Sequence, residues 1–240
     1  NDKSKVYGTA DPTLDATVSG TIGTDTVAYT LSRAAGENVG TYAITPAGEA
    51  AQGNYSVTYA PGTLTITKAP AEQNAVTATP YSGTYDAAAH TITASAAQTG
   101  STLYYSKVGG KDATDWNETA PTWTDVTTAQ TVYVKATNPN YEDSFGQATV
   151  TIMAKPVTVT ANDKSKVYGA ADPTFTGTVT GLVNAGDLGT VSYSRTNSTV
   201  NDAGTYDEVL TAAYTANSNY TVTVVKGDFT ISAKEATITV

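Results

Sequence analysis

Residues 1–13 read NDKSKVYGTADPT, and residues 162–174 read NDKSKVYGAADPT. The two stretches differ only at Thr9, which corresponds to Ala170, so one segment occurs twice at an offset of 161 residues. A long internal repeat is typical of a chain built from tandem structural units. We therefore expect two copies of one small module, which we call copy one and copy two.

Further landmarks follow in the same order in both copies. The offset between matching landmarks rises from 161 to 165 residues, because short insertions lie between them. Such insertions are expected in surface loops. The matched pairs are residues 18–20 with 179–181, 27–29 with 191–193, 40–42 with 204–206, 54–58 with 219–223, and 62–67 with 227–232.

The stretch between the copies lacks the KVYG and ADPT strings, and we interpret it as a different β-module. Pro70 and Pro156 mark its boundaries, because Pro ends a strand ladder and stiffens a joint. The predicted segments are copy one (1–68, without its first strand), the middle module (69–154), copy two (155–233) and the first strand of a further repeat (234–240).

Composition and periodicity both favour β-structure. The chain contains 47 Thr and 16 Tyr but only three Phe, and Val157 and Val159 alternate with Thr158 and Thr160. Period-two alternation is typical of a sheet with one wet face. We predict an all-β fold of three small antiparallel β-sandwich modules, Ig-like or β-grasp-like, in an elongated rod. A short helical turn at 46–51 would favour the β-grasp alternative.

The predicted core follows from the same alternation. In copy one it comprises Val6, Val18, Val27, Tyr42, Tyr55, Val57, Leu64 and Ile66. In copy two the equivalents are Val167, Val179, Val191, Tyr206, Tyr220, Val222, Phe229 and Ile231.

Charge and rare residues exclude several functions. The formal net charge is -9, with 22 acidic and 13 basic residues and no basic cluster, so nucleic acid is a poor partner. The sequence contains no run of about 18 apolar residues, so it does not predict insertion into a membrane. With no Cys and one His, we expect no disulfide, no metal site and no cofactor.

The ends of the chain differ from each other. Copy two is preceded by Pro156-Val157-Thr158-Val159-Thr160-Ala161, whereas copy one starts at Asn1 without such a strand. Residues 234–240, KEATITV, resemble that opening strand. We expect the chain to be a window on a longer array, with an open edge on copy one. The prediction is that Ala236–Val240 pairs with the open edge of another molecule's first module, or is disordered.

The string Lys-Val-Tyr-Gly-x-Ala-Asp-Pro-Thr, followed by Gly-Thr-Tyr, Asn-Tyr-x-Val and a closing Leu/Phe-Thr-Ile, resembles the MBG repeats ("mostly beta, glycine-rich") of large bacterial surface proteins and adhesins. The resemblance covers residues 1–68 and 155–233. The middle module resembles a bacterial Ig-like repeat of the same proteins, at residues 81–85 and 132–141. The resemblance implies an extracellular bacterial cell-surface stalk or adhesin fragment. It implies no enzymatic activity and brings no defined ligand.

Tyr7, Gly8, Asp11 and Pro12 form a structural motif that recurs in copy two as Tyr168, Gly169, Asp172 and Pro173. We interpret both sets as turn chemistry. Gly supplies a positive φ, Tyr covers the end of the sandwich, Asp accepts backbone N–H bonds and Pro fixes φ.

Candidate ligand-binding residues gather in the middle module: Trp116, Trp123, Tyr104, Tyr105 and Asp115. Trp side chains on a β-scaffold can stack on sugar rings, and a carboxylate such as that of Asp115 can bind hydroxyl groups. The alternative is that one Trp fills the core between two sheets.

The sequence leaves three functions open. The first is a non-catalytic stalk that joins further repeats of the same chain. The second is a module that binds host or dietary glycans or mucin-like glycoproteins through the Trp residues. The third is homotypic adhesion through open strand edges. We expect a monomer with edge-strand contacts. We expect no enzyme, because paired carboxylates such as Asp112 and Asp115 have no predicted cleft between them.

Overall fold

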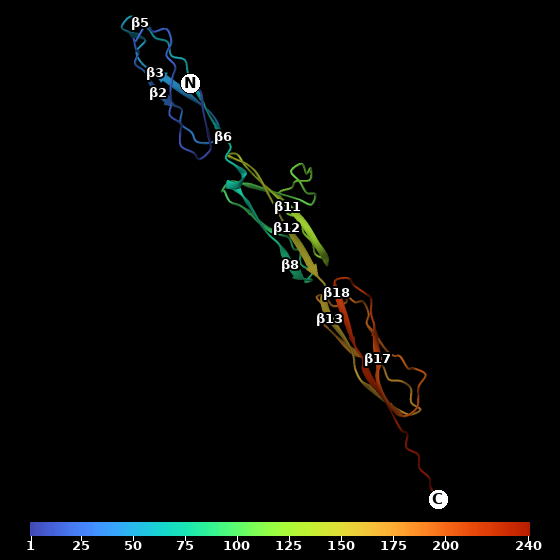
Figure 1. Cartoon of the computed structure of the whole chain (residues 1–240). Coiled ribbons are helices and arrows are strands. Elements are labelled where there is room, and N and C mark those ends of the chain that lie inside the picture. The colour runs from blue at the N-terminus through green and yellow to red at the C-terminus, as the bar shows by residue number, and fades with distance from the viewer. The chain divides into compact units, whose positions relative to one another are not determined.

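The computed structural model describes residues 1–240 as an all-β chain of 19 strands (Figure 1). The predicted all-β class is confirmed. The one helical element is a 3-10 turn, η1 (Ala71–Asn74), and no helix is long and apolar enough to span a membrane. The helical turn expected at 46–51 is wrong, because Pro46 and Ala47 end a strand and Ala51 begins another.

Contacts group the residues into two compact units. The first unit comprises Asn1–Thr79, Ile92–Pro121 and Val132–Ala148. The second comprises Pro80–Thr91, Thr122–Thr131 and Thr149–Val240. The first unit therefore contains copy one and part of the middle module, and the second contains the rest of the middle module and copy two.

Copy one contains one four-stranded sheet and a small hairpin. The sheet has the order β1-β6-β3-β2, and β4 pairs with β5. Ile44, Leu64 and Ile66 form its buried core, against which Leu14 and Tyr42 pack. The strands are β1 (Lys3–Val6), β2 (Thr30–Arg33), β3 (Gly40–Ala47), β4 (Ala51–Gln52), β5 (Tyr55–Ser56) and β6 (Gly62–Thr67).

Copy two contains two sheets, with orders β14-β19-β17-β16 and β15-β13-β18. Its core cluster of Ala161, Leu210, Phe229 and Ile231 takes residues from both sheets, which makes this copy a β-sandwich. The strands are β13 (Lys155–Ala161), β14 (Lys164–Val167), β15 (Gly177–Thr180), β16 (Ser192–Arg195), β17 (Gly204–Ala213), β18 (Tyr220–Val225) and β19 (Gly227–Ser232).

The middle module has the sheet order β10-β11-β12-β8 and a second pair, β7-β9. Val132, Val134 and Ala136 of β11 alternate with more exposed residues and are fully buried. The strands are β7 (Val76–Thr79), β8 (Tyr81–Thr84), β9 (Thr93–Ala96), β10 (Thr102–Ser106), β11 (Thr127–Asn138) and β12 (Tyr141–Met153).

The sheets are mixed rather than purely antiparallel. Four strand pairs are parallel: β1 with β6, β8 with β12, β13 with β18, and β14 with β19. Parallel neighbours need long crossovers between them, and here the rest of each module supplies that connection.

The predicted core is partly wrong at the module edges. Leu64, Ile66, Phe229 and Ile231 are buried as expected, but Val6, Val18 and Val167 are exposed. In β1 the alternation turns Lys5 inward and Val6 outward. Lys5 therefore occupies the inward-facing position of β1 that the predicted alternation assigned to Val6. Ile44 and Leu210 are core residues that the sequence analysis missed.

One part of the predicted alignment between the copies is also wrong. Arg33 lies opposite Ile44, and Arg195 lies opposite Leu210, so these two Arg residues are equivalent at an offset of 162. Tyr193 therefore corresponds to Leu31 and not to Tyr29. The copies also differ further along the chain, where the register between β17 and β19 shifts between Tyr206 and Leu210.

Candidate functional site

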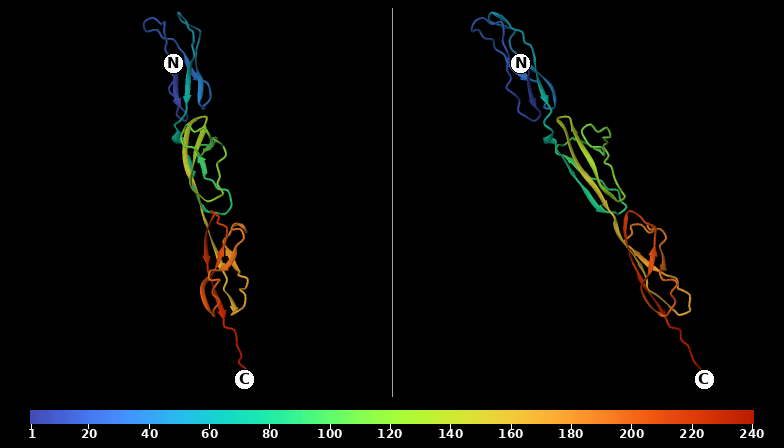
Figure 2. Two further views of the ribbon diagram at one scale, coloured as in Figure 1. Left: turned by 90° about the vertical axis from the view of Figure 1, so that its right-hand side faces the viewer. Right: turned by 45° about the vertical axis from the view of Figure 1, so that its right-hand side comes forward.

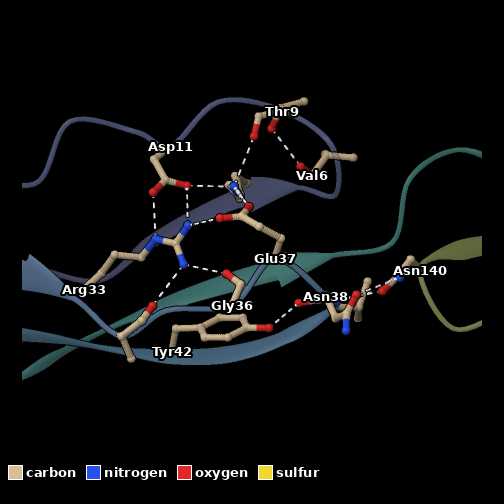
Figure 3. A network of polar contacts seen from close by, with 12 residues as sticks. Val6, Thr9, Asp11, Arg33, Gly36, Glu37, Asn38, Tyr42 and Asn140 are labelled. Atoms are coloured by element: carbon tan, nitrogen blue, oxygen red, sulfur yellow. Dashed lines mark hydrogen bonds and ion pairs between the residues drawn. The ribbon is translucent and has the colours of Figure 1, made fainter.

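A network of charged side chains lies at the start of copy one (Figure 3). The Lys5 ammonium group lies 2.7 Å from Asp11 and 2.6 Å from Glu37, and the Arg33 Nε atom lies 2.7 Å from Asp11. Arg33 also pairs with Glu37 and donates to the Gly36 carbonyl oxygen. Only 4% of the Lys5 side chain is exposed. The Lys of the repeated string is therefore an internal ion-pair partner.

Copy two contains the same network. Lys166 lies 2.8 Å from Asp172, and the Arg195 Nε atom lies 2.6 Å from the same carboxylate. Asn201 replaces the acid of copy one and accepts a hydrogen bond from Lys166 at 2.8 Å. Both Asp residues thus bind side-chain cations, whereas the sequence analysis expected them to accept backbone N–H bonds.

The ion pairs shift the pKa values of these groups. Hydrogen bonds from Arg33 and Lys5 lower the pKa of Asp11, and those from Lys5 and Arg33 lower the pKa of Glu37. Burial acts to raise the pKa of Asp172, but the hydrogen bonds from Lys166 and Arg195 outweigh burial and lower it. The hydrogen bond to Asp11 raises the pKa of Lys5. All four groups are held in their charged forms.

The Tyr-Gly turns follow directly after the first strand of each network. Gly8 has a φ of 79° and Gly169 a φ of 83°, in the left-handed region that favours glycine. Pro12 and Pro173, next to the ion-paired Asp residues, are half-buried. The Tyr7 ring packs against the core of copy one, whereas Tyr168 is half exposed.

The joint between copy one and the middle module is built on Asn140 and Tyr141. The Val39 N–H donates to the Asn140 Oδ1 atom at 2.9 Å, and the Asn140 Nδ2 atom donates to Asn38 at 3.0 Å (Figure 3). The Tyr141 ring meets the Tyr7 ring edge to face, with centroids 5.2 Å apart. The Tyr of the Tyr-Gly turn is thus one half of an aromatic pair across this joint.

The joint between the middle module and copy two repeats this geometry with Asn219 and Tyr220. The Val126 N–H donates to the Asn219 Oδ1 atom at 2.8 Å, and the Asn219 Nδ2 atom donates to Asp125 at 2.9 Å. The Tyr220 ring meets the Tyr85 ring edge to face at 5.4 Å. The same Asn-Tyr pair therefore makes both joints.

Backbone hydrogen bonds complete each joint. The Ala69 N–H donates to the Asn140 carbonyl oxygen, and the Lys155 N–H donates to the Asn219 carbonyl oxygen, both at 2.9 Å. The residue before the boundary Pro is thus tied to the Asn of the next module in both cases.

Trp116 lies in a shallow aromatic depression of the first unit. The depression has a volume of about 390 Å³, and its lining includes Lys111, Trp116, Tyr133 and Phe145. The Trp116 and Phe145 centroids are 6.1 Å apart, and the Lys135 ammonium group lies 4.9 Å from the Trp116 ring. The indole N–H of Trp116 is buried without a hydrogen-bond partner.

The other candidate residues of the first unit divide between two faces. Tyr104 lies opposite Lys135, which stands 5.2 Å from the Tyr104 ring and also faces Trp116. Tyr105 lies opposite buried Val134, so the adjacent Tyr side chains point to opposite faces of the sheet. Tyr104 and Tyr105 therefore do not form one binding surface.

Asp115 holds the loop that carries Trp116. Its carboxylate accepts hydrogen bonds from the Ser106 hydroxyl and, at 3.2 Å, from the Lys107 N–H. The hydrogen bond from Ser106 lowers the pKa of Asp115. These hydrogen bonds tie the Asp115 carboxylate to Ser106 and Lys107.

Trp123 belongs to the second unit. Its backbone pairs with that of His90, through N–H···O bonds of 2.8 and 3.0 Å. The His90 ring stacks on Tyr81 at 4.0 Å and lies 2.8 Å from Asp86. The half-buried Trp123 thus lies next to a polar aromatic cluster.

The sequence analysis missed the joint residues Asn140 and Asn219 and the network residues Lys5, Arg33 and Arg195. The Asn-Tyr pair occurs three times in the sequence, at 54–55, 140–141 and 219–220. That recurrence was the available signal. The pairs at 54–55 and 219–220 were used only as landmarks of the repeat, because one sequence does not show which loop each Asn contacts.

The sheets and joints define a chain of small, tandem all-β modules. The model of the MBG domain family (YGX type) matches residues 1–65 and 157–230, which together make up more than half of the chain. The chain therefore belongs to the MBG domain family, and the predicted resemblance is confirmed. No curated protein matches the chain.

Solved structures show only a distant likeness. Mouse cadherin-23 (EC22-24) is 11% identical over 81% of this chain and 74% of that chain, with a TM-score of 0.26. Drosophila N-cadherin (EC1-3) is 10% identical over 84% and 79%, with a TM-score of 0.28. The I9-I11 tandem from titin is 9% identical over 86% and 82%, with a TM-score of 0.29.

Proposed function

We propose that the chain is a non-catalytic spacer segment of an extracellular, bacterial, adhesin-like surface protein. The observation that carries this proposal is the joint that occurs twice with the same residue types. A spacer must keep a fixed angle between neighbouring modules, and a specific joint limits bending where a free linker would not.

The chemistry of the joint supports this role. Each Asn side chain makes two hydrogen bonds to the preceding module, worth about 0.5–1.5 kcal/mol each. Each edge-to-face Tyr pair adds about 0.5–1.5 kcal/mol. Together these contacts favour the closed joint over an open one by about 1.5–4.5 kcal/mol, a population ratio of at least about 10.

Small-angle X-ray scattering tests the spacer function. We expect the maximum dimension of an elongated rod for the natural sequence, and a smaller radius of gyration for the double variant Asn140→Ala, Asn219→Ala. Asn162→Ala is the matched control, because Asn162 is an exposed Asn of copy two whose side chain donates to Thr176 and belongs to neither joint. Identical scattering from all three proteins would remove the support for a joint-based spacer.

A second function is supported by the aromatic depression around Trp116. Trp116, Tyr133 and Phe145 offer apolar ring faces for a sugar, and Lys111 adds a cation at the rim. This combination suits a glycan that carries an acidic group, which matches the mucin-like glycoproteins expected as partners. The carboxylate of Asp115 is tied within the loop, so we assign it no contact with the sugar.

A glycan array tests this second function. We expect binding that is lost in Trp116→Ala and kept in Trp123→Ala, with circular dichroism showing that both variants are folded. Equal loss in both variants, or no binding by the natural sequence at high concentration, would leave the spacer as the only function.

A further inference from the structure

Each module pairs an early strand with its last strand in parallel, and we call this pair the clamp of the module. The clamps are β1 with β6 in copy one, β8 with β12 in the middle module, and β14 with β19 in copy two, and each register covers four residue pairs. The residue after the early strand donates its backbone N–H to the carbonyl oxygen that ends the last strand. These bonds of 2.8–2.9 Å run from Tyr7 to Thr67, from Tyr85 to Met153 and from Tyr168 to Ser232.

The parallel direction of a clamp decides how it responds when the chain is pulled. The chain enters a module on the side of the early strand and leaves it from the last strand. Because both strands run in the same direction, these two points lie at opposite ends of the shared ladder. Tension therefore slides the strands past each other and loads all hydrogen bonds of the ladder together. A hairpin that is pulled at its open end loads its bonds one after another, so it yields at a lower force.

One position of the ladder distinguishes the clamp of copy two from that of the middle module. Lys166 of β14 lies opposite Ile231 and contacts Asp172 at 2.8 Å, with 6% of its side chain exposed. Gly83 lies opposite Ile152 at the same position of the middle clamp and has no side chain to make such a contact. Sliding the clamp of copy two therefore breaks a nearly buried ion pair in addition to the ladder.

The strand through which tension enters copy two is held on both sides. β12 ends at Met153 and β13 begins at Lys155, so the chain passes from the middle module into copy two almost without a break (Figure 2). β13 is the central strand of its sheet, with six residue pairs to β18 and four to β15. Its Val157 and Val159 are fully buried. Pulling β13 out therefore breaks two ladders and exposes core side chains to water.

The corresponding entry of the middle module is held more weakly. Ala69 forms a single isolated bridge with Tyr141, after which the chain turns through η1 instead of continuing that ladder. β7 pairs with one neighbour, β9, over four residue pairs, and none of its residues is fully buried. Pulling β7 out therefore breaks one short ladder and exposes less apolar surface than pulling out β13.

We propose that the chain bears tension through its clamps and that the middle module yields before copy two. The two clamps have ladders of equal length, so the difference comes from β13 and from Lys166. Releasing the chain between Thr84 and Met153 adds up to about 240 Å of extended chain while copy two stays folded. Tension on the chain rests on the proposed spacer function, whereas the strength of each clamp is a property of its module.

Single-molecule force spectroscopy with engineered disulfides tests the order of yielding. The chain has no Cys, so engineered cysteines have no native partner. A disulfide between exposed partner residues at the end of a clamp removes the extension of the residues that it encloses, when the chain is pulled between handle proteins fused to its two ends. The three pairs are Thr84→Cys with Met153→Cys in the middle module, Val167→Cys with Ser232→Cys in copy two, and Val6→Cys with Thr67→Cys in copy one.

With copy one locked, we expect two unfolding events in the oxidised chain. The event at lower force should disappear when the middle module is also locked, and the event at higher force should disappear when copy two is locked instead. Reduction of each variant is the control and should restore the missing events. Equal forces for the two events, or loss of the lower-force event on locking copy two, overturns the proposed order.

The direction of pulling tests the clamp itself. Copy two is pulled between Ser192→Cys and Ala213→Cys, exposed partners at the open end of the hairpin of β16 and β17. This direction peels β16 from β17 one residue pair at a time. We expect copy two to yield at a force at least about twofold lower than when it is pulled along the chain.

An equal or higher force in the peeling direction shows that the clamp does not bear the load, and it overturns the proposal. Such a result would leave the spacer function standing, because small-angle X-ray scattering measures bending in the absence of load. The failure of the clamps and the failure of the spacer are thus separate outcomes.

Discussion

At the scale of single residues, the ion-pair networks explain why Lys, Asp and a distant Arg recur together. The two copies differ in how far water reaches the network. The Arg195 side chain is 2% exposed and its partner Asp172 29%, whereas Arg33 is 15% and Asp11 40% exposed. Solvent screens an exposed ion pair much more than a buried one, so the network of copy two contributes more to stability.

Removing one partner tests this difference. Arg195→Ala leaves Asp172 with Lys166 alone and opens the space over the Phe229 ring, which Arg195 covers at 4.9 Å. We expect a loss of about 2–4 kcal/mol in the free energy of unfolding of copy two. Hydrogen exchange of each copy, measured against denaturant, checks this value. Arg33→Ala is the matched control and should cost copy one less; an equal cost would contradict the screening argument.

The lowered pKa values of Asp11, Glu37 and Asp172 predict a loss of stability in acid. A carboxyl group with a folded pKa below its unfolded value stabilises the fold above the unfolded pKa, and this contribution is lost as the pH falls through the folded pKa. We expect Tm to be flat at neutral pH and to fall below about pH 4. Calorimetry from pH 2 to 7 measures Tm at each pH and checks this prediction.

Asp11→Asn provides the control for the acid transition. Its Tm should be lower than that of the natural sequence at pH 7 and should converge with it as the pH falls. A constant Tm difference between the two proteins over the whole range would show that the ion pairs of Asp11 are not the cause.

At the scale of elements, the irregularity in β17 separates the two copies most clearly. Tyr42 and Ile44 lie opposite Leu64 and Gly62, but Tyr206 and Leu210 lie opposite Phe229 and Gly227, so copy two has two more residues at this point. A bulge of this kind bends the strand and changes its local twist. Within it Glu208 has a φ of 52°, which costs energy for any residue with a Cβ atom.

Glycine at position 208 should relieve this cost. We expect Glu208→Gly to raise the free energy of unfolding of copy two by about 0.5–1 kcal/mol. Asp207→Gly, at the neighbouring residue with an ordinary φ, should lower it, because glycine gains more entropy in the unfolded chain. Urea denaturation of the two variants measures both values, and a loss of stability in Glu208→Gly would contradict the strain at this residue.

The sequence predicted a strand well where the alternation of apolar residues is local, and poorly where burial depends on residues from other segments. The strands β6, β13 and β19 were predictable because Leu64-Thr65-Ile66 and Val157-Thr158-Val159 alternate without interruption. The same alternation failed to predict the burial of Lys5, because its inward position depends on the charged network of Asp11, Arg33 and Glu37, which come from other segments. Periodicity reports burial but not the partners that make a buried charge acceptable.

The candidate site shows the same limit. The aromatic residues Trp116 and Tyr104 were identified from composition, and the structure brings them together around Lys135. Tyr105 was wrongly grouped with them because neighbours in a strand point to opposite faces. The joint residue Asn140 was missed because its partners, Asn38 and Val39, lie about a hundred positions earlier in the chain.

At the scale of the whole molecule, the two joints limit how far neighbouring modules bend. If Asn140 with Tyr141, and Asn219 with Tyr220, hold neighbouring modules, then bending is limited at each boundary independently. Each joint lies inside one compact unit, so its rigidity can be measured without reference to the other. The absence of Cys makes such measurements specific, because engineered cysteines are the only sites for a label.

The most direct measurement is the distance distribution between two spin labels placed across one joint. Exposed strand residues give one pair for each joint, Thr45→Cys with Thr93→Cys and Ser82→Cys with Ser192→Cys. We predict one narrow distance for each pair, and a broad distribution for the first pair alone when Asn140→Ala is added. Broad distributions in both pairs of the otherwise natural sequence would contradict a joint-based spacer.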